Sequence, residues 1–427
     1  MKNDTKSFLN EVKSQIKSKE AQEFVATELD YHLKESKIKW IERGFTESLA
    51  EEKAVKQMGN PIRIGQQLNK IHRPKVDWLM ITLLIITMGL SFLPIFIEGF
   101  TYDSSISINK LIIVIIGIVT VVGMMFIDYR KLENFGWLFY LIGSLILLSI
   151  YFFSNTMIFG RPLIDLKVLT IESLMAIPFF FLAWASFFNN NKFKILHLVI
   201  LSVISISLFY LVTNLTSIYI YIFMTFTMIW WSKFNKKKIL YLHIVLGLMT
   251  LMTSIFLLQN IKQYQITRLL AYLNPNKYGN FTIMQLKDMF ETAGWFGQSS
   301  DTKFLQGAFT DFAFVSLTYY YGWLFASVLA IILFLFVVRI VLLLTKIKDS
   351  FGKLLLVGVV SIYLVQLVSN IGMTFGWTPL MPISLPFISY GLMPTLLNAF
   401  LIGVALSVYR RKNIVFMRYK NSESNFE

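Results

Sequence analysis

The feature that most constrains this chain is a series of apolar runs separated by short polar loops. A bilayer-crossing α-helix needs about 20 consecutive apolar residues, and 55% of the 427 residues are hydrophobic whereas 15% are charged. The sequence therefore predicts an all-α, polytopic membrane protein with about ten transmembrane helices. The predicted spans are roughly 77–97, 110–128, 133–153, 170–188, 194–213, 216–232, 238–258, 311–344, 353–375 and 385–408. The run 311–344 exceeds one bilayer thickness, so we expect it to be tilted or to extend into solvent.

Positive charges in alternate loops predict the orientation of these spans. They occur at Arg130–Lys131, Lys192–Lys194, Lys236–Lys238 and in the tail Arg410–Lys412. Cytoplasmic loops carry an excess of Lys and Arg, so both termini are expected in the cytoplasm and the long loop 259–310 outside. The net charge of +15 then reflects the topology of a multi-pass cell-membrane protein rather than binding to nucleic acid.

The chain divides into a helical prefix, residues 1–76, a membrane domain, residues 77–412, and a cytoplasmic tail, residues 413–427. Within the prefix, Phe8, Val12 and Ile16 recur at helical spacing, and Gly59-Asn60-Pro61 marks the start of a last short helix. Two interpretations stay open: a cytoplasmic docking module for a protein partner, and a bundle that packs only on itself. Basic residues just before the first span favour contact with anionic membrane lipids.

Composition also excludes several classes of chemistry. The chain has no cysteine, which removes disulfides, thiol nucleophiles and cysteine metal sites. Its four histidines are scattered, which argues against a histidine metal cluster, and we assign no metal-ligating residue. It has no glycine-rich phosphate loop followed by Lys and Ser or Thr, so the sequence does not support ATP-driven transport by this chain.

Asp311 is the candidate catalytic residue, because it enters the membrane at the start of a predicted span. A carboxylate at that depth is costly unless it faces water or a partner, so its default interpretation is functional. Partial burial would raise its pKa toward the range in which a carboxylate accepts a proton from a hydroxyl. The alternative is that Thr310-Asp311 caps the helix that follows.

A second polar stretch, residues 366–398, is expected to form the other wall of the same site. Its Pro386 and Gly391 predict a break in the helix, which is tolerated at membrane depth where backbone lines a cavity or is buried in protein. The alternative is a tight outer loop. Gln366 and Asn370 are four residues apart and share a helix face. They would either contact a ligand or hydrogen-bond between helices.

The outer loop carries Arg268, Lys277, Lys287 and Lys303, although positive charge outside opposes the usual bias. Such cations near a carboxylate at membrane level suit an anionic, lipid-linked substrate whose phosphates need cations while a sugar hydroxyl needs a base. The alternative is a solvated loop of ordinary charge balance, since acidic residues are also present.

These motifs together resemble the SEDS family (shape, elongation, division and sporulation), typified by FtsW, RodA and SpoVE. The resemblance covers the membrane part of the chain. It is carried by Thr310-Asp311-Phe312-Ala313-Phe314, by Gln366 with Asn370-Ile371-Gly372-Met373, and by Leu385-Pro386-Phe387-Ile388-Ser389-Tyr390-Gly391. Arg268 with Asn274-Pro275 falls in the family's order.

The resemblance implies a peptidoglycan glycosyltransferase that polymerises lipid II beside a class B penicillin-binding protein. Asp311 matches the family's essential aspartate, proposed to activate the acceptor hydroxyl for attack on a lipid-pyrophosphate donor. The resemblance also allows a divalent cation, Mg²⁺ or Mn²⁺, and implies no other cofactor. The substrate-binding residues that we assign are Arg161, Glu172, Arg268, Thr310, Gln366, Asn370, Pro386 and Ser389.

Several positions depart from the family pattern. Phe309 replaces a histidine, Tyr319 and Tyr320 replace paired glutamates, Glu172 is displaced by one place, and Ala176 replaces a lysine. A divergent member of the family is therefore expected. Two further functions stay open beside the enzyme: a lipid II translocator, motivated by a cavity between broken helices, and a catalytically weak scaffold for a cell wall synthesis complex, motivated by the prefix and these departures.

Overall fold

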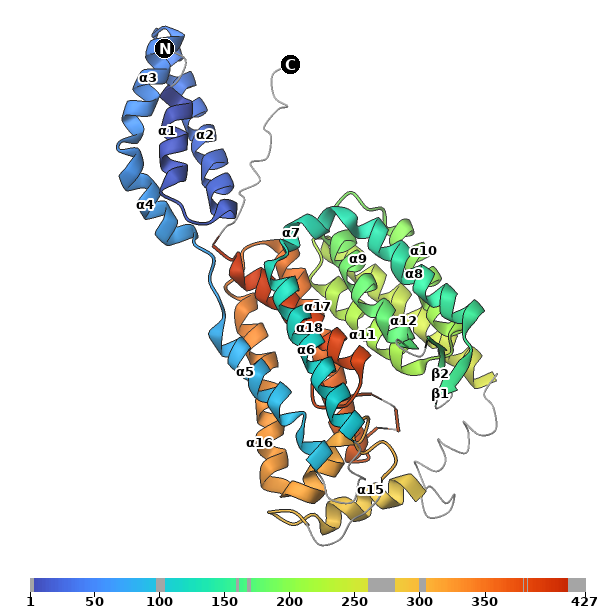
Figure 1. Ribbon diagram of the computed structural model, residues 1–427. Helices are drawn as coiled ribbons and strands as arrows, with labels where there is room; N and C mark the ends of the chain where they lie inside the picture. Colours follow the sequence, from blue (N-terminus) through green and yellow to red (C-terminus); the bar gives the residue numbers. More distant parts are fainter. Residues whose placement is uncertain are drawn as a thin grey trace. The chain divides into compact units, whose positions relative to one another are not determined.

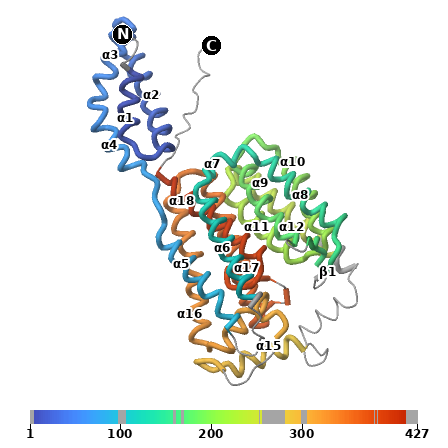
Figure 2. The backbone as a smooth tube through the Cα atoms, in the orientation of Figure 1, coloured from blue at the N-terminus to red at the C-terminus, as the bar shows by residue number. Residues whose placement is uncertain are grey.

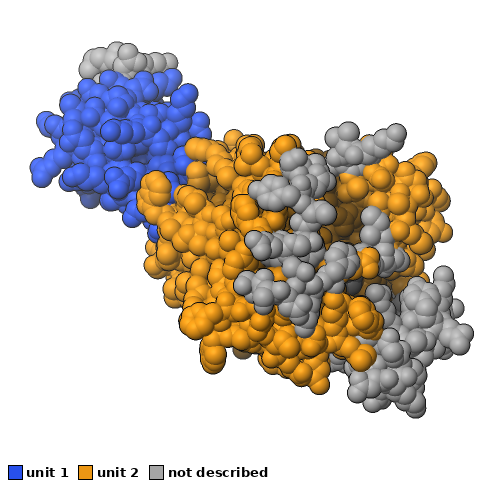
Figure 3. All heavy atoms as spheres, turned by 60° about the horizontal axis from the view of Figure 1, so that its bottom comes forward, with its two compact units in different colours: residues 1–76, 409–427 blue, residues 77–408 orange. Residues whose placement is uncertain are grey.

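The computed structural model describes residues 4–96, 104–158, 161–166, 170–259, 281–298, 305–378, 380–381 and 383–413. The chain forms two compact units, residues 1–76 with 409–427 and residues 77–408 (Figure 3). Each unit is described separately below.

The first unit is a bundle of four helices, α1 (Asp4–Ser14), α2 (Lys19–Glu42), α3 (Glu47–Met58) and α4 (Pro61–His72). Asn60 caps α4 by accepting from the backbone N–H groups of Ile62 and Arg63, so the start predicted at Gly59-Asn60-Pro61 is confirmed. The helices bury one apolar stripe each, and the resulting core contains Phe8, Val12, Ile16, Ala21, Phe24, Val25, Leu33 and Ala54.

Residues that follow the last helix of the chain complete this unit. The Arg411 guanidinium donates to both carboxylate oxygens of Glu20, at 2.9 and 2.7 Å, and its side chain has no exposed surface. The side-chain amide of Asn413 donates to the carbonyl oxygen of Ile71. The backbone N–H of Lys75 donates to the carbonyl oxygen of Arg410. The unit is therefore built from two segments far apart in sequence.

The second unit contains a helix at each predicted span, and the all-α polytopic prediction is confirmed. Among the residues that the structure describes, six segments are long and apolar enough to cross a membrane. They are Trp78–Phe96 (α5 Trp78–Leu90 with η1 Leu93–Phe96), Ile106–Phe126 (in α6, Ser104–Phe126), Tyr129–Phe153 (α7 Tyr129–Leu132, η2 Glu133–Phe135, α8 Gly136–Phe153), α16 (Ala313–Leu344), α17 (Ser350–Thr374) and α18 (Leu392–Arg410). Shorter apolar helices are η3 with α9 (Ser173–Asn189), α10 (Ile195–Leu211) and α11 (Leu215–Trp230), and α12 (Lys236–Gln259) follows.

Helices α17 and α18 lie at the centre of this unit. Their apolar windows are 78% and 72% buried, whereas the other four long spans are 17–39% buried. Figures 1 and 2 show α17 between α16 on one side and α9 and α11 on the other, and α17 packs against all three. The helical parts of the stretch 366–398 therefore belong to the two most enclosed of these six long spans.

Helix α16 is interrupted at Gly322, where φ is +86° and ψ is +169°. The loop Gly294–Gln298 fills the interruption, because Trp323 and Leu324 donate their N–H groups to the carbonyl oxygens of Gly294 and Trp295. A Cβ atom at Gly322 would lie 2.3 Å from the Trp295 carbonyl oxygen, so only glycine fits. A break in the helix, which we did not predict, thus accompanies its unusual length.

Two short strands and a loop helix lie outside the predicted elements, and a third strand occupies the start of the predicted span 170–188, which therefore begins too early. Strands β1 (Thr156–Ile158), β2 (Arg161–Asp165) and β3 (Thr170–Ile171) form an antiparallel sheet in the order β1-β2-β3, with Thr156 opposite Leu163 and Ile164 opposite Ile171. Helix α15 (Phe281–Thr292) lies across the end of α16 (Figure 1). The last predicted span, 385–408, begins too early, because the backbone before Leu392 is not helical.

Candidate active site

The turn that carries Asp311 is held by its backbone. The backbone N–H of Tyr390 donates to the Phe309 carbonyl oxygen at 2.6 Å, the Ser389 hydroxyl donates to that of Thr310, and the Asn370 amide donates to that of Asp311 at 2.8 Å. All three donors come from α17 or from the loop Leu385–Gly391. The two polar stretches that the sequence pairs as walls of one site therefore contact each other directly.

Asp311 itself does not cap α16. The residue at the N-cap position is Phe312, and no side chain caps the helix there, while the Thr310 hydroxyl donates to the Gly307 carbonyl oxygen. Burial raises the pKa of the Asp311 carboxyl, and the Arg161 cation and a hydrogen bond from Ser384 act in the opposite direction. The capping alternative is thus not what the structure shows.

The small sheet brings a cation and a second carboxylate to Asp311. Arg161 begins β2 and Glu172 directly follows β3, the antiparallel neighbour of β2, and both residues line the same pocket. Arg161 Nη2 lies 3.6 Å from Asp311 Oδ2, and the two side chains are 20% and 18% exposed. Burial raises the pKa of Glu172, Arg161 opposes this, and the charge of Asp311 adds to it. The cation is therefore shared by two partly desolvated carboxylates.

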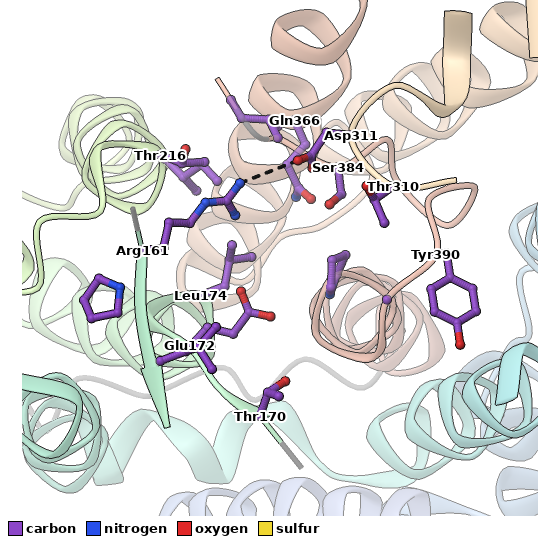
Figure 4. A pocket seen from close by; sticks show the side chains of 16 residues that line it. Arg161, Thr170, Glu172, Leu174, Thr216, Thr310, Asp311, Gln366, Ser384 and Tyr390 are labelled. Carbon is purple, nitrogen blue, oxygen red and sulfur yellow. Dashed lines mark ion pairs between the residues drawn. The ribbon is translucent and has the colours of Figure 1, made fainter. Parts of the chain in front are cut away.

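These residues line a pocket of about 210 Å³. Figure 4 shows Arg161 reaching toward Asp311, with Glu172 and Thr170 on the same side of the pocket as Arg161. The pocket is smaller than the roughly 300–1,000 Å³ of sites that enclose a drug-sized ligand. The lining residues are Arg161, Pro162, Leu163, Thr170, Glu172, Leu174, Thr216, Ile220, Thr310, Asp311, Gln366, Ile383, Ser384, Tyr390, Gly391 and Pro394.

The structure brings Arg161, Glu172, Thr310, Asp311 and Gln366 together in this pocket. Of these, Gln366 is 2% exposed, and its carbonyl oxygen accepts from Asn398 at 3.1 Å. Its hydrogen bonding is therefore that of the interhelical alternative, and substrate contact by Gln366 stays a prediction.

Three other predicted site residues are buried behind the pocket wall. Asn370 has no exposed surface, and its amide also donates to the Ile383 carbonyl oxygen at 2.6 Å. Ser389 is 1% exposed and accepts from the Leu385 N–H at 2.8 Å, and Pro386 is buried in the same loop. Their contacts support the wall. Arg268, with Asn274-Pro275, lies outside the described residues.

The departures from the resemblance have structural consequences. Ala176 is fully buried and supplies no cation, while the Arg161 guanidinium lies beside the carboxylates instead. Tyr319 is 1% exposed and packs in an apolar cluster with Leu286, Met289 and Leu305. A paired-glutamate site is thus replaced by aromatic packing between α15 and α16.

Sequence reasoning missed several polar residues of the site, namely Thr170, Thr216, Ser384 and Tyr390. Ser384 and Tyr390 flank or belong to the loop that was singled out, so proximity to that loop was an available signal. Thr170 and Thr216 are hydroxyls without a motif, and only the chain's path through the sheet and α11 places them here.

A sequence profile of a family described as cell cycle protein, named for FtsW, RodA and SpoVE, matches residues 75–414. The chain belongs to the FtsW/RodA/SpoVE family. The family region excludes most of the helical prefix, and it contains every described residue of the pocket.

Curated members of the FtsW/RodA/SpoVE family align with about a third of this chain. A probable peptidoglycan glycosyltransferase FtsW of Geobacter metallireducens is 32% identical over 156 residues, 35% of this chain and 42% of the relative. Stage V sporulation protein E of Bacillus subtilis is 32% identical over 155 residues, 34% of this chain and 42% of the relative. The chain spans about two fifths of the length of these relatives.

Solved structures of the FtsW/RodA/SpoVE family share the fold. A chain of a peptidoglycan synthase complex that coordinates polymerization and crosslinking aligns with a TM-score of 0.67 at 19% identity, covering 79% of this chain and 98% of that one. The rod shape determining protein RodA of Thermus thermophilus aligns with a TM-score of 0.58 at 17% identity, covering 79% and 97%.

Proposed function

We propose that this protein is a peptidoglycan glycosyltransferase that polymerises lipid II at the outer face of the cytoplasmic membrane. The polymer would serve cell wall synthesis in growth, division or sporulation. The observation that carries the proposal is the backbone-held Asp311 in a pocket that it shares with Arg161 and Glu172. The name of the Geobacter metallireducens relative, probable peptidoglycan glycosyltransferase FtsW, supports the same reaction class.

In the proposed reaction, Asp311 accepts the proton of the acceptor sugar hydroxyl. The hydroxyl oxygen forms a bond to the anomeric carbon of the donor sugar, and the bond from that carbon to the pyrophosphate oxygen breaks. The lipid pyrophosphate leaves with the electron pair. Burial raises the pKa of Asp311, which makes it a stronger base than an exposed carboxylate.

Arg161 supports the leaving group in this proposal. Its guanidinium contacts Asp311 at 3.6 Å, longer than the 2.7–2.9 Å that is typical of a tight charged hydrogen bond. A pyrophosphate entering the pocket would compete for the same donors, and guanidinium binds phosphate in a bidentate way. Transfer of Arg161 from the carboxylate to the phosphate would free Asp311 to take the proton.

A divalent cation stays part of the proposal. Mg²⁺ is commonly held by one or two carboxylates together with substrate phosphates, and Asp311 and Glu172 supply two carboxylates in the pocket. Among the described residues no group of three or more metal-binding side chains occurs, so the pyrophosphate would have to complete the coordination. Chelation of Mg²⁺ and Mn²⁺ is expected to abolish polymerisation, and adding either ion back should restore it.

We also propose a class B penicillin-binding protein as the partner, since a structural neighbour belongs to a peptidoglycan synthase complex. Both termini are proposed to lie in the cytoplasm and the loop 259–310 outside, which places Asp311 at the outer leaflet where lipid-linked donors are presented. The first unit then lies in the cytoplasm, available to a protein partner there.

Polymer formation from lipid II by purified protein, with and without the penicillin-binding partner, tests the proposed activity. Asp311→Asn should abolish polymerisation, because the neutral amide accepts no proton, while the melting temperature stays close to that of the wild type. Asp288→Asn, which neutralises an exposed carboxylate on α15, is the matched control and should retain activity.

Two other functions predict different results. A translocator would move fluorescent lipid II across liposome bilayers, also when Asp311 is replaced by Asn. It would form no polymer, either as the wild type or as Asp311→Asn. A scaffold would lose cellular function on deletion of residues 1–72 and not on replacement of Asp311. Either pattern would overturn the glycosyltransferase proposal.

A further inference from the structure

Lys110 is a buried charge in a membrane-spanning helix. It lies within the apolar segment Ile106–Phe126 of α6, and 1% of its surface is exposed. A lysine at membrane depth is costly unless its ammonium group finds partners inside the protein. Because the side chain reaches neither lipid nor water, partners inside the protein must stabilise its charge.

The ammonium group of Lys110 contacts the loop between α17 and α18. Its Nζ atom donates to the carbonyl oxygens of Ile388 and Ser389, at 3.4 and 3.3 Å, and lies 6.0 Å from the ring centre of Tyr390. An ammonium group has three donors and no acceptor, so carbonyl oxygens are suitable partners. Lys110 thus binds two consecutive peptide units of the Leu385–Gly391 loop.

That loop has a strained backbone, which its surroundings must hold. Phe387 has a φ of +62°, in the left-handed region that a residue with a bulky side chain rarely adopts. Such a conformation is energetically unfavourable and persists only where neighbouring contacts determine it. The contacts of Lys110 to the next two residues are part of this support.

The other side of the same loop holds the catalytic turn. Ser389 and Tyr390 donate to the carbonyl oxygens of Thr310 and Phe309, directly before Asp311. Ser389 therefore receives Lys110 on its carbonyl oxygen and holds Thr310 with its hydroxyl. One loop residue connects the buried cation to the turn that carries the proposed base.

The helix that carries Lys110 is itself packed closely against α18. A Cβ atom at Gly117 of α6 would lie 3.1 Å from the Thr395 methyl, and one at Gly403 of α18 would lie 2.6 Å from Met124 Cβ. Small residues at both points let the two helices approach. Because α6 is fixed against α18, the Lys110 ammonium group has a fixed place relative to the loop.

We propose that Lys110 is a positioning residue for Asp311, holding the Leu385–Gly391 loop so that the loop holds the Phe309–Asp311 turn. The effect expected on kcat rests on the proposed glycosyltransferase function. Lys110 touches neither substrate nor reacting atoms. Its removal displaces the base relative to the bound acceptor, while Arg161 and Glu172, which are not in this loop or turn, stay in place.

Lys110→Met, which keeps most of the side-chain length and removes the charge and donors, tests this role by steady-state polymerisation. We expect kcat to fall roughly tenfold to 100-fold, because small displacements of reacting groups have effects of that size, while KM changes by less than about threefold. Lys131→Met is the matched control, since it removes an exposed lysine beyond the other end of α6. An unchanged kcat in folded Lys110→Met protein would overturn the proposal.

Lys110→Gln keeps a donor without the charge and serves if the methionine variant does not fold. Its kcat should lie between those of the wild type and Lys110→Met. If Lys110→Met does not fold, the kcat of Lys110→Gln should still be well below that of the wild type. A wild-type kcat in Lys110→Gln overturns the proposal.

A second readout does not depend on activity. The chain has no cysteine, so Ser384→Cys introduces a single thiol beside Asp311. Its labelling by a water-soluble maleimide should be several-fold faster when Lys110 is replaced by Met or Gln, and unchanged when Lys131 is replaced. Equal labelling rates would sink the positioning role. If the wild type makes no polymer but labelling still responds, the proposed function fails and the contact between α6 and the loop stands.

Discussion

At the scale of single residues, the site depends on one cation placed between two carboxylates. Arg161 opposes the effect of burial on both Asp311 and Glu172. Asp311 remains in a pocket at 18% exposure, so the ion pair does not seal it from a substrate. The sequence could identify Asp311 by its position at a span and by its motif. It could not show that Arg161 would be the partner, because that pairing depends on the fold of β2 and β3.

Replacing Arg161 with Met should shift the pH dependence of the reaction. Asp311 accepts a proton only when it is deprotonated, so activity is lost as the pH falls through its pKa, which burial raises. Arg161 lowers that pKa, and its removal raises the pKa further. The acidic limb of the kcat/KM profile should therefore move to higher pH, with a maximal rate about tenfold to 100-fold lower from the lost charge stabilisation.

The same profile should be measured for Lys287→Met, which removes an exposed cation from α15. Its acidic limb should coincide with that of the wild type. An acidic limb that stays in place in Arg161→Met would show that Arg161 does not act on the titrating base.

Asn370→Asp tests the support behind the base. The Asn370 amide donates to the carbonyl oxygens of Asp311 and Ile383, and a carboxylate there would face two acceptors instead. We expect kcat to fall at least about tenfold with a lower melting temperature. The control Asn191→Asp changes an exposed residue of the turn between α9 and α10 and should alter neither quantity.

At the scale of elements, breaks in helices position the site. The interruption of α16 at Gly322 lets the Gly294–Gln298 loop bond to the helix backbone, and the nonhelical segment before Leu392 holds the Asp311 turn. Proline and glycine in 385–391 made the second break predictable. The first was not, because Gly322 is a lone glycine in an apolar run and helices tolerate such residues.

Gly322→Ala should destabilise the protein strongly. The backbone is left-handed at this residue, and a Cβ atom would lie 2.3 Å from the Trp295 carbonyl oxygen, so α16 and the loop cannot both keep their positions. We expect a loss of more than about 2 kcal/mol, seen as a large decrease in melting temperature in detergent or as failure to accumulate.

Gly123→Ala in α6 is the matched control, because no atom lies within 4 Å of the added methyl group. Alanine favours helix over glycine by about 1 kcal/mol, so this variant should be as stable as the wild type or more stable. Equal melting temperatures for the two alanine variants would contradict the role given to Gly322.

At the scale of the whole molecule, two compact units share one chain, and residues 409–413 belong to the first. Spacing of apolar residues predicted the four helices of this unit. It could not predict that Arg411, more than 300 residues later, would pair with Glu20 inside it. We expect that pair to stabilise the helical unit.

Glu20→Gln should accelerate backbone hydrogen exchange in α1–α4. The Arg411 side chain has no exposed surface, so replacing the Glu20 carboxylate by a neutral amide removes charge compensation from a buried cation. Because Glu20 is 35% exposed, we expect a moderate loss of roughly 1–3 kcal/mol, or about fivefold to 100-fold faster exchange.

Exchange in residues 77–408 should stay unchanged in that variant. Glu23→Gln, on an exposed position of α2, is the control and should exchange at the wild-type rate throughout. Unchanged protection of α1–α4 in Glu20→Gln would show that the pair contributes nothing to the unit.

The sequence by itself determined the fold class, the presence of a helix at each predicted span and the helical prefix, and it singled out Asp311 as the candidate base. These follow from local patterns, since run length, helical periodicity and the cost of a charge in an apolar segment can be read along the chain. The tertiary structure decided the pairing of Asp311 with Arg161, the burial of Asn370 and Ser389 behind the pocket, the break at Gly322 and the contacts of Lys110. Each of these joins residues far apart in sequence, and such contacts are fixed only when the helices pack.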